Sequence, residues 1–280
     1  MKQKISITIN EKILRDIDSI IDRLIIQNRS QAIEYLIKKA MQETKTAVIL
    51  AGESEVLSKN KIKNRYTLKI DSQTLIEKMI KKLSDSGFRN IYVIAEHDTL
   101  TNIFNLVGDG SLYKSKIEFI NEEKTTKGNA SALKILRGKI KTTFLVLQND
   151  LVIDHINLLE LWKQHIQDKN VATLLVCSKI AQEKTIMYGH VGLERNKVIS
   201  FIEKPALKNV ESSLFFGGIF VAEPAILNYN GDFFELDIFP ELAKRNLLGG
   251  QITNKEHLHI HTREDLARVK RKIKEIEKGL

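Results

Sequence analysis

One short stretch places a glycine where a phosphate group could approach the backbone. The stretch VILAGESEVLSKN ends an apolar run, typical of a strand, in Leu50, Ala51 and Gly52. Glycine has no Cβ and lets backbone N–H groups come close to an anion. The next positions carry Glu53 and Glu55, where further glycine would complete such a loop. Because carboxylates repel phosphate, the stretch raises the question of whether a nucleotide's phosphates can still bind here.

A second group of residues that could do chemistry is the alternating set His257, His259 and His261 in the stretch HLHIH. Alternate residues of a strand share one face, and three imidazoles on one face could bind Zn²⁺ or Ni²⁺. Same-face neighbours lie roughly 6 to 7 Å apart, which is awkward for three ligands of one ion. We therefore expect these histidines to line a pocket wall or the surface, with a metal site as the alternative.

The composition is that of a globular protein with an excess of positive charge. The chain has 280 residues, 42% of them hydrophobic, a formal charge of +9 and one cysteine, Cys177. A basic excess is compatible with a polyanionic partner. We expect Cys177 to be a buried structural thiol, and no intrachain disulfide can form. With neither a signal peptide nor an apolar run long enough to span a bilayer, we expect a cytoplasmic protein without membrane association.

The elements that must position these residues begin with a small N-terminal pattern. KISITI, at residues 4–9, alternates apolar and polar side chains, which predicts a strand. Apolar spacings of three and four predict a first helix from a cap at Asn10 to Leu24, and a second from a cap at Ser30 to Met41. A module this small cannot bury its apolar faces alone. We therefore expect two copies to pair, each lending its strand to a two-stranded ribbon.

This pattern resembles the ribbon-helix-helix family of dimeric repressors, over Met1 to about Gln42. The resemblance implies a homodimer whose paired strands enter the major groove of double-stranded DNA. The base-reading positions would be Lys4, Ser6 and Thr8. The phosphate-binding positions at the start of the second helix would be Asn28, Arg29 and Ser30. A dimerisation module without a DNA target is the alternative.

From Ala47 onward the hydrophobic pattern changes to that of an α/β domain. Apolar strands alternate with amphipathic helices in the order AVILA, LIEKMIKKLSDSG, NIYVIAE, KIEFIN, ASALKILRG and TFLVLQND. This alternation predicts a mostly parallel sheet flanked by helices. We therefore expect two domains, residues 1–44 and 46–280, joined by the polar junction ETKT.

Five stretches of the second domain resemble, in this order, motifs of the sugar-phosphate nucleotidyltransferases, which join a nucleoside triphosphate to a sugar 1-phosphate. They are LAG from Leu50, KGNASAL from Lys127, LQND from Leu147, YGHVGLERNKVISFIEKP from Tyr188 and FFGGIFV from Phe215. The resemblance spans about Thr46 to Ile273. It implies a Rossmann-like (GT-A-like) mixed sheet with ligands at the carboxyl ends of the strands.

The resemblance also implies roles for individual residues. Asp150 takes the place of an aspartate that holds Mg²⁺, Arg65 that of a lysine at the α-phosphate, and Lys204 that of a lysine at the sugar phosphate. His259 stands where a second metal aspartate is expected, and imidazole is a poor ligand for Mg²⁺. The nucleotide-binding positions are Leu50, Ala51, Gly52, Gly128, Asn129 and Ala130. The sugar-binding positions are Tyr188, Gly189, Glu203, Lys204 and Gly218.

Two functional hypotheses follow. In the first, the chain is a DNA-binding regulator whose second domain binds a nucleotide, nucleotide sugar or sugar phosphate without efficient catalysis. In the second, it is an active sugar-1-phosphate nucleotidyltransferase that uses Mg²⁺, with the first domain serving for dimerisation or DNA binding. Arg65 and the loop lysines Lys59, Lys61 and Lys63 would then compensate for the altered glycine loop. The other interpretation of these lysines is a solvated charge run.

Overall fold

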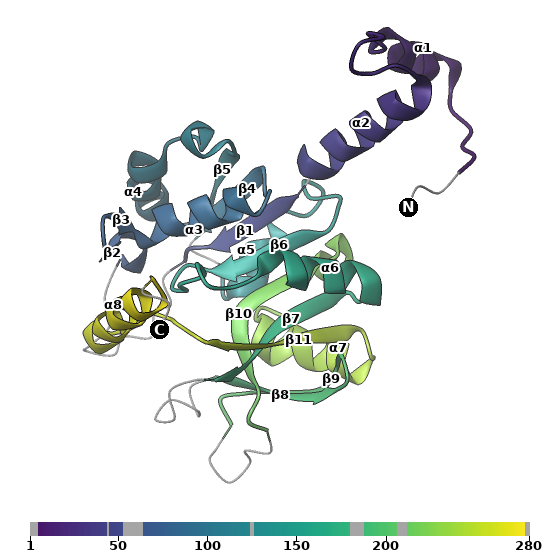
Figure 1. Cartoon of the computed structure of the whole chain (residues 1–280). Coiled ribbons are helices and arrows are strands. Elements are labelled where there is room, and N and C mark those ends of the chain that lie inside the picture. Colours follow the sequence, from purple (N-terminus) through teal and green to yellow (C-terminus); the bar gives the residue numbers. More distant parts are fainter. Residues whose placement is uncertain are drawn as a thin grey trace. The chain divides into compact units, whose positions relative to one another are not determined.

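The chain divides into two compact units, Met1–Thr44 and Lys45–Leu280 (Figure 1). The computed structural model describes residues 5–43, 45–52, 64–123, 126–179, 188–205 and 212–277. Each unit is considered by itself below. None of the helices within the described ranges combines the length and the apolar character that a bilayer crossing requires.

The first helix of the small unit, α1 (Glu11–Ser19), begins at the expected cap. The side chain of Asn10 accepts a hydrogen bond from the N–H of Lys12 at 2.8 Å. The helix ends five residues before the predicted end at Leu24. The reason is Asp22, whose Oδ1 accepts the N–H groups of Leu24, Ile25 and Ile26, each at 2.8 Å. An aspartate that binds the backbone ahead of it stabilises a turn in competition with the helix.

The second helix, α2 (Arg29–Glu43), begins before Ser30, so the prediction of Ser30 as its cap is wrong. Oδ1 of Asn28 accepts the N–H of Gln31 at 3.0 Å, which is the capping contact. The guanidinium of Arg29 binds both carboxylate oxygens of Asp18 on α1, at 2.7 and 2.9 Å. Both side chains are exposed, so this pair joins the two helices but adds little to stability.

Residues 5–10 form no strand in the described chain, contrary to the prediction for residues 4–9. A strand needs a neighbour to exchange hydrogen bonds with, and the described part of the single chain offers none to this segment. Ile5 and Ile7 remain 72% and 52% exposed. Ser6 and Thr8 are exposed as well, and Lys4 lies outside the described residues. The base-reading role of these three residues stays a prediction.

The large unit is built on one nine-stranded mixed sheet in the order β5-β4-β1-β6-β10-β7-β11-β9-β8 (Figure 1). Its strands are β1 (Thr46–Leu50), β4 (Asn90–Ala95), β5 (Lys116–Asn121), β6 (Phe144–Gln148), β7 (Ala172–Lys179), β8 (Gly189–Glu194), β9 (Lys197–Glu203), β10 (Phe215–Ala222) and β11 (Leu248–Glu256). A separate two-stranded ribbon joins β2 (Lys69–Ile70) to β3 (Gln73–Thr74). The strands predicted from apolar runs are present.

The sheet has a parallel half and a mixed half, in which β7 and β11 are parallel and the other pairs are antiparallel. β5, β4, β1 and β6 run parallel, as the strand–helix alternation predicts. β10 is antiparallel to both of its neighbours, β6 and β7. The result is the α/β, Rossmann-like mixed sheet that the family resemblance implies, and it places the carboxyl ends of β1 and β6 side by side.

Helices cover both faces of this sheet. The helices of the large unit are α3 (Leu75–Asp85), α4 (His97–Val107), α5 (Asn129–Lys134), α6 (Leu158–Asp168), α7 (Phe239–Lys244) and α8 (Arg263–Glu277). Side chains of α3, α4, α6 and α8 enter one apolar cluster, and side chains of α5 and α7 enter the other. β1 contributes Ala47 and Ile49 to the first cluster and Val48 and Leu50 to the second. A strand covered on both faces reads as a continuous apolar run.

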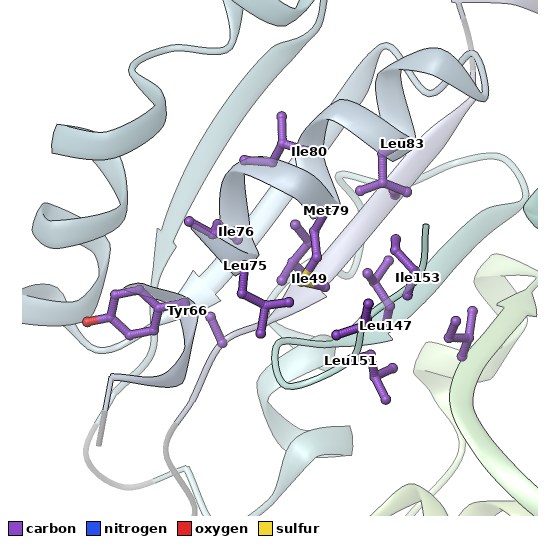
Figure 2. Packing of buried hydrophobic residues seen from close by; sticks show 14 of the residues in the cluster. Ile49, Tyr66, Leu75, Ile76, Met79, Ile80, Leu83, Leu147, Leu151 and Ile153 are labelled. Carbon is purple, nitrogen blue, oxygen red and sulfur yellow. The ribbon is translucent and has the colours of Figure 1, made fainter. Parts of the chain in front are cut away.

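Helix α3 illustrates how the sequence forms the core. Thr74 and Glu77 form a capping box at its start. Apolar residues then recur at spacings of three and four. Figure 2 shows Leu75, Met79 and Leu83 on the side of the helix toward Ile49 and Leu147 of the sheet. The buried stripe consists of Leu75, Ile76, Met79, Ile80 and Leu83. Each such side chain contributes about 1.5 to 3 kcal/mol by leaving water.

Cys177 lies in the middle of this structure, on β7. It is fully buried, and burial raises the pKa of its thiol to about 12. The prediction of a buried structural thiol is confirmed.

Candidate functional site

The loops after β1 and β6 leave the carboxyl edge of the sheet together. Leu50 and Gln148 are register partners. Beyond them, the side-chain amide of Asn149 donates to the carbonyl of Ala51 at 3.1 Å, and its backbone N–H donates to the carbonyl of Leu50 at 3.2 Å. The LAG and LQND motifs, about a hundred positions apart, are thereby locked into one edge.

Arg65 and Asp150 form a buried ion pair at this edge. Nη1 of Arg65 donates to Oδ2 of Asp150 at 3.1 Å, and their side chains are 12% and 8% exposed. The same nitrogen donates to Nδ1 of His261 at 2.6 Å, and that ring nitrogen lies 3.4 Å from Oδ2. The structure thus brings together two sequence-predicted residues, although their predicted partners were a phosphate and a metal ion.

The three alternating histidines follow β11 and share one face. HLHIH is not the regular strand that the sequence predicts. β11 ends at Glu256, and a single bridge then pairs His259 with Leu151. Successive ring centroids of His257, His259 and His261 lie 5.3 and 4.6 Å apart. Burial lowers the pKa of His257 to about 4. The three rings thus form one wall of side chains with a neutral His257 at one end. That they line a pocket stays a prediction.

Tyr188 connects this wall to the predicted sugar-binding residues. Its hydroxyl lies 2.5 and 2.9 Å from the two ring nitrogens of His259. Its carbonyl accepts the backbone N–H of Lys204 at 3.2 Å. Lys204 has a left-handed backbone with φ of 44°, and its ammonium pairs with Glu203 at 3.2 Å. Tyr188, Glu203 and Lys204 therefore lie together, as predicted.

Two glycines of the predicted site are required by close contacts. A Cβ on Gly189 would lie 2.5 Å from the ring of Phe201 and 2.9 Å from a carboxylate oxygen of Glu203. Gly218 has a φ of +67° at a bulge in β10, and its Cβ would lie 3.0 Å from Leu151. Both glycines allow neighbouring segments to approach the edge of the sheet.

The turn at Gly128, Asn129 and Ala130 is satisfied from within the protein. The backbone N–H of Ala130 donates to the carbonyl of Asp232 at 3.0 Å. The amide of Asn129 donates to both carboxylate oxygens of Glu235, at 3.0 and 2.8 Å. The Asn129 side chain and the Ala130 N–H, which the sequence resemblance assigned to a nucleotide, are therefore hydrogen-bonded to Glu235 and Asp232.

Comparison with known proteins decides the family. A model of the nucleotidyl transferase family matches residues 46–255. The chain belongs to the nucleotidyl transferase family. It is 29% identical to a UTP–glucose-1-phosphate uridylyltransferase of Synechocystis sp.. The alignment spans 189 residues and covers 62% of this chain. Those residues are 48% of the relative, so the chain spans about half the length of the curated relative it matches.

A solved structure shares the fold of this nucleotidyl transferase. It is a crystal structure from Bacillus anthracis, designated a glucose-1-phosphate thymidylyltransferase in complex with sucrose. The TM-score is 0.67 at 18% identity, and the match covers 81% of this chain and 94% of that chain. At this identity the likeness shows the fold alone.

Nucleotidyl transferases of this family typically use a divalent metal, commonly Mg²⁺. The donor set here does not fit such an ion. Oδ2 of Asp150 is paired with a guanidinium, and only its buried Oδ1 has no hydrogen-bond partner among the described residues. The neighbouring donors are imidazoles, whereas Mg²⁺ prefers oxygen ligands. Within the described ranges, no group of three or more His, Cys, Asp or Glu is arranged to hold a metal.

Glu235 is a site residue that the sequence analysis missed. It lies in a π-helical turn (Phe234–Ile238), a feature frequent at functional sites. Besides the amide of Asn129, it accepts the amide of Gln148 at 3.2 Å. Burial is the main cause that raises the pKa of Glu235, and the charges of Glu203 and Lys204 reach it. The available signal was the two carboxylates, Glu235 and Asp237, inside the otherwise apolar run FFELDIF.

Glu122 is a second missed residue, and it lies beside the LAG motif. A Cβ on Gly52 would lie 2.9 Å from a carboxylate oxygen of Glu122. Burial, followed by the charge of Glu96, raises the pKa of Glu122. Glu53, Glu55 and the lysines Lys59, Lys61 and Lys63 lie outside the described residues. A carboxylate is nevertheless present next to Gly52, contributed by another segment of the chain.

Proposed function

We propose that the large unit binds a nucleotide sugar or sugar phosphate at the carboxyl edge of the sheet and turns it over poorly. The buried Arg65–Asp150 ion pair carries this proposal. In a transferase of this kind the phosphates are positioned and neutralised by cations. Here one oxygen of the aspartate implied to hold the metal is occupied by the arginine that replaces the implied lysine. The proposal is therefore a site whose groups serve recognition more than catalysis.

The charge distribution supports the same conclusion. The carboxylate of Glu122 beside Gly52 repels the tail of a nucleoside triphosphate. Glu203, Lys204 and Tyr188 remain together where a sugar phosphate is expected to bind. The balance favours a ligand with few phosphates over a triphosphate.

Thermal unfolding tests binding, and pyrophosphate release tests turnover. We expect UDP-glucose, dTDP-glucose or another nucleotide sugar of a panel to raise the Tm, since a ligand that binds the folded state stabilises it by mass action. Pyrophosphate release from NTP and glucose 1-phosphate should stay near background. Glu122→Gln should strengthen binding of UTP more than binding of UDP-glucose. A panel in which no ligand shifts the Tm of the folded protein contradicts the proposal.

An active sugar-1-phosphate nucleotidyltransferase is the second candidate function. The match to a relative named UTP–glucose-1-phosphate uridylyltransferase favours it. Turnover with a rate constant of about 1 s⁻¹ or more, as is typical of enzymes, would establish this function and remove the first.

For the small unit we propose a homodimer that binds double-stranded DNA. Large apolar side chains remain exposed on this unit, as expected for a surface that a second copy covers. They are Ile5, Ile7, Ile13, Leu24, Ile25 and Ile37. Size-exclusion chromatography with light scattering tests the dimer. A gel shift with fragments of the protein's own genomic region tests DNA binding, with Thr8→Ala as the variant. If the protein is a dimer but shifts no DNA fragment, the small unit is a dimerisation module without a DNA target.

A further inference from the structure

We infer that the Arg65 guanidinium takes the place of the family's divalent cation, so that this site binds the phosphate of its ligand without metal. The inference rests on the proposed function, because it concerns how the same site recognises its ligand. It follows from the mismatch between the donor set around Asp150 and the ion that the family uses.

The position of the guanidinium is fixed from two sides. Asp150 and His261 both contact Nη1, at 3.1 and 2.6 Å. The donation to Nδ1 of His261 requires that ring nitrogen to act as an acceptor. Within the described residues, these contacts use one of the three guanidinium nitrogens. A guanidinium carries five N–H donors in a rigid fork, so the hydrogens of Nε and Nη2 remain for a phosphate.

The guanidinium is also in the same contact network as the sugar-phosphate residues. The ring of His261 packs 4.6 Å from that of His259, and His259 contacts the hydroxyl of Tyr188. The carbonyl of Tyr188 holds the backbone N–H of Lys204. One continuous set of contacts thus runs from Arg65 to Lys204.

The charges at this wall disfavour a divalent ion. Arg65 and Lys204 supply two positive charges, and Asp150 and Glu203 supply two negative charges. A divalent ion at Asp150 would face the guanidinium that already binds that carboxylate, and like charges at this range repel strongly. A guanidinium binds phosphate through charge-assisted hydrogen bonds that require no metal.

The test is calorimetric titration of the full chain with UDP-glucose, dTDP-glucose and glucose 1-phosphate, in EDTA and in Mg²⁺. For the ligand that binds, we expect the two dissociation constants to agree within about twofold, since the hydrogen bonds to phosphate come from protein groups. In EDTA, Arg65→Ala should weaken binding by about 10- to 100-fold. Arg65→Lys should weaken it by about tenfold, because an ammonium lacks the fork. Addition of Mg²⁺ should restore part of the affinity of Arg65→Ala, whose Asp150 is released.

Arg245→Ala is the matched control, because Arg245 pairs with Glu241 at 3.2 Å on α7 and both side chains are exposed. Its affinity should equal that of the wild type. If the wild type binds only when Mg²⁺ is present, the inference is wrong and the proposed function stands. If it binds in neither buffer, both are wrong. Unchanged affinity of Arg65→Lys in EDTA also overturns the inference, and its Tm verifies that this milder variant is folded.

Discussion

Two acidic side chains at the site differ in the charge of their partners: one pairs with a cation and the other with neutral amides. Asp150 is held by the guanidinium of Arg65, which compensates its negative charge. Glu235 receives hydrogen bonds from the neutral amides of Asn129 and Gln148, and burial raises its pKa. Because amides do not compensate a charge, Glu235 makes the stability of the folded protein depend on pH.

The consequence for stability has a definite sign. The pKa of Glu235 lies above its ordinary value of 4.5 in the folded protein, so the folded state holds this proton more tightly than the unfolded state. The free energy of unfolding therefore falls as the pH rises from 4.5 through the folded pKa. Glu235→Gln should lose less Tm than the wild type between about pH 5 and about pH 8. Parallel curves of Tm against pH for the two proteins would contradict this expectation.

At the scale of elements, the bulge of β10 is the feature that places Gly218 against Leu151. The register of β10 with β7 shifts between Phe216 and Phe220. A bulge bends one strand and changes which side chains it presents. Here the bulge lies beside the loop of Asp150, so the shape of the site depends on a residue without a side chain.

Gly218→Ala should destabilise the protein more than Gly138→Ala. Both glycines have positive φ, +67° and +81°, and an alanine there costs about 1 to 2 kcal/mol in backbone strain. Only Gly218 adds a close contact, since a Cβ on Gly138 would meet nothing within 4 Å. Urea unfolding of the two variants measures the difference. Equal losses would mean that Leu151 moves aside without penalty.

The elements also mark how far the sequence could predict the structure. The stripe of α3 and the cap at Asn10 were predictable, because each follows from residues only a few positions apart. The early end of α1 depends on one carboxylate, Asp22, whose turn competes with a helical pattern. The Arg65–Asp150 pair joins residues 85 positions apart. No periodicity shows that an arginine and an aspartate, each assigned to a ligand, bind each other.

At the scale of the whole molecule, the two units differ in how much of their apolar surface each buries by itself. The two apolar clusters lie within the large unit, whereas the small unit leaves several isoleucines exposed. A surface of that kind is suited to association with another copy. The large unit, by contrast, has the core that a domain of its size needs to fold alone.

A fragment that begins at Lys45 should therefore fold and bind the same ligand as the full chain. We expect equal dissociation constants for the fragment and the full chain in titration calorimetry. Light scattering should give a monomer for the fragment and a dimer for the full chain. A fragment that remains dimeric would place the association surface on the large unit instead.

The lone thiol of Cys177 makes these comparisons measurable without engineering. Thiolate is the form that reacts with disulfide reagents such as DTNB, and a buried thiol with a pKa of about 12 is neutral and shielded. Labelling must then wait until β7 separates from its neighbours, so its rate reports how often the middle of the sheet opens. A ligand that stabilises the large unit will slow the labelling of Cys177 by DTNB, so the labelling rate measures how much of the protein has ligand bound.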